Sequence, residues 1–187
     1  MKKFNTFVTF LLCLLCFVSC GKTKIPEEGG ELSIDEYEVT VSFANWSNDE
    51  SIIGGALNKD KINNSDKTHY PIFKMETKEN LERFKYYYSD VLSMNETYDE
   101  VESFENVTSK YDEAFFETNT LLIVYVDANS GSLRFGVSGV YCDSKSVCVY
   151  VENLNNPTIF TDDMVGWFIT VAISNSTIYG CQYFDAY

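Results

Sequence analysis

Strand-like segments fill the last third of the chain, and they constrain its fold more than any other feature. Leu121 to Val126 is an unbroken apolar run of strand length. Asp143-Ser144-Lys145-Ser146 separates two further segments and is typical of a hairpin turn. In addition to the first run, strands are predicted at residues 133–142, 147–154 and 167–174, with an edge strand at 178–184. This order favours a largely antiparallel sheet.

The preceding residues add two strands and two helices. Apolar and polar residues alternate from Tyr37 to Phe43, which predicts a half-buried strand, and residues 70–75 resemble a second one. Leu81, Phe84 and Tyr88 follow helical spacing and predict a helix near 78–92. A short helix is predicted at 109–117, and residues 45–68 are expected to form a surface loop.

These segments together predict the fold class and the domain. We expect an α+β fold with a largely antiparallel β-sheet and two helices packed on it. About 150 residues follow the N-terminal region, which suits a single domain over 37–187.

The N-terminus has the pattern of an export signal. Lys2 and Lys3 are followed by residues 7–18, which are apolar except for Thr9 and too few to span a bilayer as a helix. The sequence Phe17-Val18-Ser19-Cys20 then resembles the lipobox of bacterial lipoproteins, in which the cysteine is lipidated. Cys13 and Cys16 each follow a bulky leucine and do not fit this pattern. Secretion with an unmodified Cys20 is the alternative.

Lipidation of Cys20 would divide the chain into three parts and place it on a membrane. Residues 1–19 would be the signal peptide, 20–36 a lipid-anchored flexible tether, and 37–187 the domain. Several acyl chains on one cysteine give stable anchoring. The predicted location is the extracytoplasmic face of the cell envelope, with the membrane as a partner through Cys20.

Charge and histidine content exclude several classes of function. The chain has 14 Lys+Arg against 28 Asp+Glu, a net charge of −14, so we expect no nucleic-acid partner. His69 is the single histidine, and no Gly-x-Ser-x-Gly motif occurs. The sequence therefore predicts no catalytic residue, metal or cofactor.

Two acidic pairs and two aromatic residues are the remaining candidates for a site. Asp112-Glu113 and Asp162-Asp163 could serve as carboxylate pairs in a hydrolase, but capping of helix or turn N–H groups is the favoured interpretation. Tyr87 is expected to be exposed, because the helical pattern that buries its neighbours turns it outward. Trp46, in the predicted loop, is the other candidate for contacting a glycan.

Cys142 and Cys148 lie symmetrically about Lys145 in the predicted hairpin. If Lys145 is the apex, the two cysteines face each other across the strands, within disulfide range. A Cys142–Cys148 bridge is the preferred pairing, and pairings with Cys181 remain open.

Several short stretches between residues 70 and 174 are similar to a family of small exported bacterial proteins. They are Tyr111 to Phe116, Ser130-Gly131-Ser132, and Asp162 to Trp167 with the strand Phe168 to Val171 that follows. The family is related to the C-terminal domain of PrcB-type protease-complex proteins. This resemblance implies a non-enzymatic partner of other envelope proteins, and it supplies no functional residue.

Three functions follow from these observations. The first is a lipid-anchored envelope protein that binds another envelope protein, in an accessory or inhibitor-like role. The second is a glycan or peptidoglycan-binding module. The third is a carboxylate-dependent hydrolase.

Overall fold

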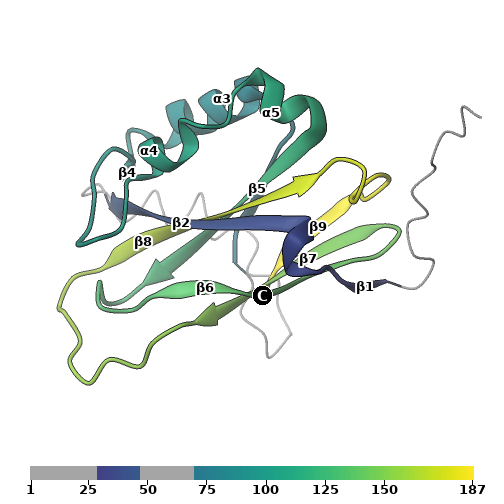
Figure 1. The fold of residues 1–187 in the computed structure, drawn as a ribbon. Helices are drawn as coiled ribbons and strands as arrows, with labels where there is room; N and C mark the ends of the chain where they lie inside the picture. Colours follow the sequence, from purple (N-terminus) through teal and green to yellow (C-terminus); the bar gives the residue numbers. More distant parts are fainter. Residues whose placement is uncertain (1–28, 47–69) are drawn as a thin grey trace, which may run out of the picture.

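The chain folds into three layers in a computed structural model that describes residues 29–46 and 70–187. Helices form one outer layer, a five-stranded sheet lies in the middle, and a four-stranded sheet forms the other outer layer (Figure 1). The α+β fold class predicted from the sequence is confirmed, but its strands are divided between two sheets.

The five-stranded sheet is antiparallel throughout. Its order is β3 (Ile72–Met75), β5 (Asn119–Ala128), β8 (Val165–Ser174), β2 (Tyr37–Trp46) and β4 (Leu92–Ser93). The long strands β5 and β8 pair over ten residues, from Asn119 opposite Ser174 to Ala128 opposite Val165. These two strands form the centre of the molecule.

The four-stranded sheet consists of a hairpin and two short edge strands. Its order is β1 (Gly30–Glu31), β6 (Phe135–Cys142), β7 (Ser146–Asn153) and β9 (Tyr183–Ala186). β9 pairs with β7 in parallel, and the other pairs are antiparallel. The pairing of β6 with β7 is irregular between Val137 and Gly139, as in a β-bulge.

Three α-helices cover the outer face of the five-stranded sheet: α3 (Lys78–Tyr88), α4 (Phe104–Thr108) and α5 (Glu113–Thr118). Side-chain caps start all three, since Thr77, Ser103 and Asp112 each accept a hydrogen bond from a backbone N–H three residues ahead. α3 ends at Tyr88, four residues before the predicted end. α4 lies in a segment for which no element was predicted.

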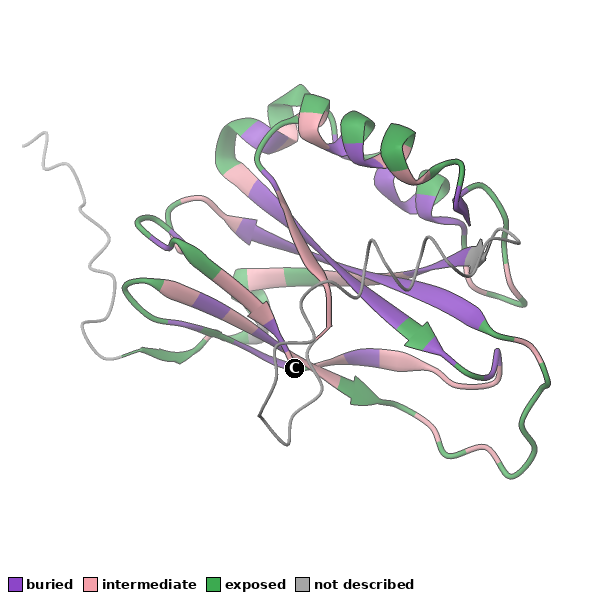
Figure 2. Ribbon diagram, turned by 180° about the vertical axis from the view of Figure 1, so that it is seen from behind, coloured by how far each residue is buried: buried purple, intermediate pink, exposed green. Residues whose placement is uncertain are grey.

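Two hydrophobic cores lie on the two faces of the middle sheet, whose central strands are buried along most of their length (Figure 2). Leu121 and Ile123 of β5 belong to the core under the helices, whereas Leu122 and Val124 belong to the core between the sheets. Alternate residues of a strand point to opposite faces. This double burial explains why β5 is an unbroken apolar run.

The domain begins earlier than the sequence indicated. Gly30 and Glu31 pair with Cys142 and Tyr141 of β6, and the Leu32 N–H donates to the Val140 carbonyl at 2.8 Å. The predicted tether boundary at residue 36 is therefore wrong. Pairing of backbone groups at a sheet edge needs no apolar side chain, so composition did not reveal it.

None of the helices in the described ranges combines the length and the apolar content that crossing a bilayer requires.

Candidate functional site

The loop between β7 and β8, residues 154–164, carries an unusual set of exposed side chains. The exposed fraction is 59% for Leu154, 80% for Ile159, 57% for Phe160 and 50% for Met164. Every other large apolar side chain that is exposed within the described residues belongs to a tyrosine. The loop extends beyond the ends of both sheets (Figure 1). We call residues 154–164 the apolar loop.

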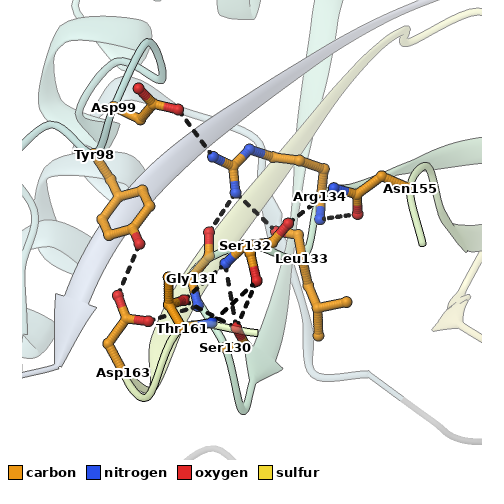
Figure 3. A network of polar contacts seen from close by, with 10 residues as sticks. All are labelled: Tyr98, Asp99, Ser130, Gly131, Ser132, Leu133, Arg134, Asn155, Thr161 and Asp163. Carbon is orange, nitrogen blue, oxygen red and sulfur yellow. Dashed lines mark hydrogen bonds and ion pairs between the residues drawn. The ribbon is translucent and has the colours of Figure 1, made fainter. Parts of the chain in front are cut away.

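Asp163 anchors the end of the apolar loop to two other segments (Figure 3). One carboxylate oxygen accepts the Gly131 N–H at 3.0 Å, and the other accepts the Tyr98 hydroxyl at 2.8 Å. Gly131 lies in the turn between β5 and β6, and a β-carbon there would collide with the Tyr98 hydroxyl. The sequence thus has glycine where this packing leaves no room for a side chain.

Three hydroxyl groups form a second attachment. The Ser130 hydroxyl lies 2.9 Å from that of Thr161 and 2.8 Å from that of Ser132. The Ser132 N–H donates to the Thr161 hydroxyl at 3.1 Å, and the Thr161 N–H donates to the Ser132 hydroxyl at 3.3 Å. Ser130 is fully buried, so its hydroxyl needs these protein partners.

Asn155 and Arg134 secure the start of the apolar loop. The Asn155 side chain accepts the Arg134 N–H at 2.9 Å and donates to the Ser132 carbonyl at 2.8 Å. The Arg134 guanidinium donates to the Gly131 carbonyl and lies 4.9 Å from the centre of the Trp167 ring, within cation–π range. Both ends of the loop are therefore attached to the turn that joins the two sheets.

The electrostatics of this network favour a charged Asp163 and a neutral Tyr98. Hydrogen bonding from Thr161, followed by Tyr98 and the Gly131 N–H, lowers the pKa of Asp163 below its usual value. The hydrogen bond to Asp163 raises the pKa of Tyr98. At neutral pH, the phenol therefore donates to a carboxylate, which is a charge-assisted and comparatively strong arrangement.

The network holds both ends of the apolar loop in place. Its polar side chains make contacts that tie the apolar loop to the 130–134 turn or to Tyr98, and a further contact ties this turn, through Arg134, to Asp99. Ile159 and Phe160 lie between the two anchored ends and contribute to neither core. The loop thus presents apolar side chains to solvent from a fixed base.

The predicted Cys142–Cys148 bridge is wrong. Cys142 lies opposite Val147, and Cys148 lies opposite Tyr141, so the two cysteines are offset by one residue. Cys142 is buried between the sheets, whereas Cys148 points to the opposite face. Lys145 was expected at the apex of the hairpin, but the Asp143 N–H donates to the Ser146 carbonyl at 3.0 Å and sets a different register.

The predicted aromatic candidates have separate outcomes. Tyr87 is exposed at 69%, as the helical pattern predicted, and neighbouring Tyr86 is exposed at 77%. Trp46 ends β2, but its side chain lies outside the described part of the structure.

A depression of about 250 Å³ lies beside the end of α3, lined by Lys85, Ser89, Leu92, Ser93, Met94, Asn95 and Glu105.

One member of each acidic pair, Asp112 and Asp163, has a structural role, and the two lie at opposite ends of β5. Asp112 caps α5 by accepting the Phe115 N–H at 2.9 Å, just before β5 begins. Asp163 contacts Gly131, three residues after β5 ends. A ten-residue strand spans about 30 Å, whereas the carboxylates of glycosidases lie about 5–10 Å apart. Asp112 and Asp163 do not form one site.

Two other residues of the sequence argument, Cys20 and His69, lie outside the described residues. Over residues 29–46 and 70–187, no group of three or more His, Cys, Asp or Glu side chains could hold a metal ion.

The network itself was not predicted from the sequence. Ser130-Gly131-Ser132 stood out for its resemblance to a known family, and Asp162-Asp163 as a pair expected to cap N–H groups, but nothing indicated that Asp163, Gly131 and Tyr98 meet. Their separation along the chain is 32 and 65 residues. The turn residues were a visible signal, and their partners depended on the packing of the sheets.

Comparison with known proteins adds no assignment. No protein-family model matches this chain, and no curated protein and no solved structure matches it either.

Proposed function

We propose that this chain is a lipid-anchored cell-envelope protein whose domain binds another envelope protein without performing a reaction. The observation that carries the proposal is the exposure of Leu154, Ile159, Phe160 and Met164 on one anchored loop. Exposed apolar side chains that gather in one place are typical of interaction surfaces.

The anchoring of the apolar loop supports binding by reducing its entropic cost. Ordering of a mobile loop at an interface opposes association, so a loop that is already fixed binds more tightly. Hydrogen bonds fix both ends of this loop: Asn155 donates to the Ser132 carbonyl, whereas Thr161 and Asp163 accept from the Ser132 and Gly131 N–H groups. Ile159 and Phe160 are then suited to enter an apolar pocket on the partner, as central anchors of an interface do.

The charge of the chain indicates what surrounds such a pocket. The net charge is −14, and Asp162 is an exposed acidic residue within the apolar loop. Complementary charge speeds encounter and selects partners. We therefore expect the partner to surround its apolar pocket with lysine and arginine residues.

The location proposed for this interaction rests on the export pattern and on Cys20. Acylation of Cys20 would hold the domain at the membrane, where its partner would also reside. The negative charge would keep the domain away from anionic lipid headgroups and leave the apolar loop accessible to proteins.

The binding proposal is tested by crosslinking and affinity capture with the full chain in mild detergent. The bait is incubated with envelope extract of the cell of origin, and captured proteins are quantified by mass spectrometry. The test variant is Ile159→Ser/Phe160→Ser, and the control is Tyr86→Ser/Tyr87→Ser, because it removes two exposed side chains from another surface.

We expect one protein to be captured near one-to-one, to be lost with the loop variant, and to be retained with the control. Loss of about tenfold or more in affinity is expected for two central apolar anchors. Equal capture by the wild type and the loop variant would contradict the assignment of the apolar loop.

Lipidation is tested separately with a metabolically incorporated fatty-acid analogue. Cys20→Ser should abolish labelling and release the protein from the membrane fraction, whereas Cys13→Ser and Cys16→Ser should have no effect. Labelling that persists in Cys20→Ser would contradict the proposed anchor, whatever the outcome for partner binding.

A glycan-binding module is the second candidate, and the surface of α3 favours it. Tyr86 and Tyr87 are exposed next to Lys85 and Ser89, which line the depression beside this helix. Tyrosine offers an apolar ring and a polar tip, which suits contact with sugars. Sedimentation with purified cell wall that is lost in Tyr87→Ala, but not in Ile159→Ser/Phe160→Ser, would favour this candidate over protein binding.

A further inference from the structure

Cys142 and Cys181 lie side by side in the core between the sheets, and their sulfur atoms are 3.7 Å apart. Both side chains are buried, with exposed fractions of 6% and 8%. Cys142 ends β6, and Cys181 lies in the segment that joins β8 to β9. The two residues are 39 positions apart in the sequence, so the tertiary structure brings them together.

The surroundings hold both thiols at this position. The Cys181 thiol donates to the Asp143 carbonyl at 3.3 Å, and the Cys142 thiol donates to the Thr177 carbonyl at 3.6 Å. A disulfide has an S–S bond of about 2.0 Å, so the sulfurs need to approach by less than 2 Å.

We propose that Cys142 and Cys181 form a disulfide bond in the mature protein. Cys142 lies at the end of β6, and Cys181 lies shortly before β9. The backbones of neighbouring residues already link these two segments, because the Gln182 and Tyr183 N–H groups donate to the Lys145 carbonyl at 2.7 and 3.0 Å. The bond would close a ring over residues 142–181, which contains β7, the apolar loop and β8. It would therefore tie the end of β6 covalently to the segment that joins β8 to β9.

The oxidation needs an external acceptor, which we take to be a small-molecule or protein disulfide of the oxidising compartment. One cysteine thiolate attacks a sulfur of this disulfide, whose S–S bond breaks and releases a first thiol. The second cysteine attacks the protein sulfur of the mixed disulfide and releases a second thiol. The pair loses two protons and two electrons, and the acceptor gains both.

Burial raises the pKa of Cys142 to about 12, so its thiol is a poor nucleophile in the folded chain. Formation of the bond is therefore expected during folding, before the pair is enclosed. This determines the experiment, in which the oxidant is present while the chain folds.

The test is refolding of the full chain in mild detergent with a mixture of reduced and oxidised glutathione. Remaining thiols are then alkylated, and the protein is cleaved after Lys, Arg and Glu. Cys142, Cys148 and Cys181 fall on separate peptides, which cover residues 135–145, 146–152 and 153–187. Mass spectrometry without reductant should recover 135–145 linked to 153–187, with Cys148 alkylated.

Thermal unfolding provides a second measurement. Addition of reductant should lower the Tm by about 10 °C in the wild type and in the control Cys148→Ser, because the constraint on the unfolded chain is removed. In Cys142→Ser and Cys181→Ser, reductant should leave the Tm unchanged. Alkylation of both Cys142 and Cys181 in the wild type, or linkage of 135–145 to 146–152, would overturn the proposal.

Discussion

Asp163 is the residue on which the geometry of the apolar loop depends most directly. Its two oxygens engage Gly131 and Tyr98, which belong to two other segments of the chain. A single carboxylate thus joins three connections between strands. The adjacent Asp162 is exposed and provides a matched comparison at the same point of the loop.

Replacement of Asp163 by alanine should destabilise the domain moderately. We expect Asp163→Ala to lower the free energy of unfolding by about 1 kcal/mol, since a partly exposed carboxylate loses two hydrogen bonds. Urea titration measures the change. Asp162→Ala should change it by less than about 0.5 kcal/mol, and equal effects of the two substitutions would contradict the structural role of Asp163.

The pKa shifts of Asp163 and Tyr98 predict a dependence on pH. The pKa of Asp163 is lowered from 3.8 by folding, so its contribution is present above about pH 4 and is lost as pH falls further. The pKa of Tyr98 is raised from 10.0, so its contribution is present below about pH 10 and is lost as pH rises.

These shifts are tested by comparing wild type with Asp163→Asn in urea titrations across pH. The difference in unfolding free energy should be constant between about pH 5 and pH 9 and should shrink toward pH 3. A difference that persists undiminished at pH 3 would show that the charge of Asp163 is not what stabilises the network.

At the scale of elements, the apolar loop combines an exposed surface with a fixed base. β7 belongs to the outer sheet and β8 to the middle sheet, so the loop connects two layers rather than two neighbouring strands. Its first anchor is Asn155, and the next residue, Asn156, is exposed. Substitution of each asparagine in turn therefore distinguishes the loss of the Asn155 hydrogen bonds from the effect of merely replacing an asparagine in this loop.

Removal of the first anchor should increase local opening of the loop. We expect Asn155→Ala to raise the rate of chymotrypsin cleavage after Phe160 about fivefold, which corresponds to a loss of about 1 kcal/mol in local stability. Gel electrophoresis over time measures the rate. Asn156→Ala should cleave like the wild type, and equal rates for all three proteins would refute the anchoring role.

At the scale of the whole molecule, the middle sheet supports both outer layers. β5 places Leu121 toward the helices and Leu122 toward the second sheet, and both side chains are fully buried. Their adjacency in one strand means that the two cores share the same backbone. The fold therefore depends on burial at both faces of β5.

Matched substitutions on β5 test this arrangement. Leu121→Ala and Leu122→Ala should each lower the unfolding free energy by about 2–5 kcal/mol, because each leaves a cavity in a packed core. Denaturant titration provides the comparison. A loss below about 1 kcal/mol for Leu122→Ala alone would contradict the packing of the four-stranded sheet on β5.

Patterns of neighbouring residues were sufficient to predict the local features of this protein. Period-two and period-3.6 patterns predicted most strands and α3, including the exposure of Tyr87, because these patterns depend on residues only a few positions apart. Tertiary packing decided the rest. It divided the strands into two sheets, brought Tyr98, Gly131 and Asp163 together, and set the one-residue offset that separates Cys142 from Cys148. Strand register and long-range contacts depend on how all three layers pack together. A pattern of neighbouring residues carries no information about that packing.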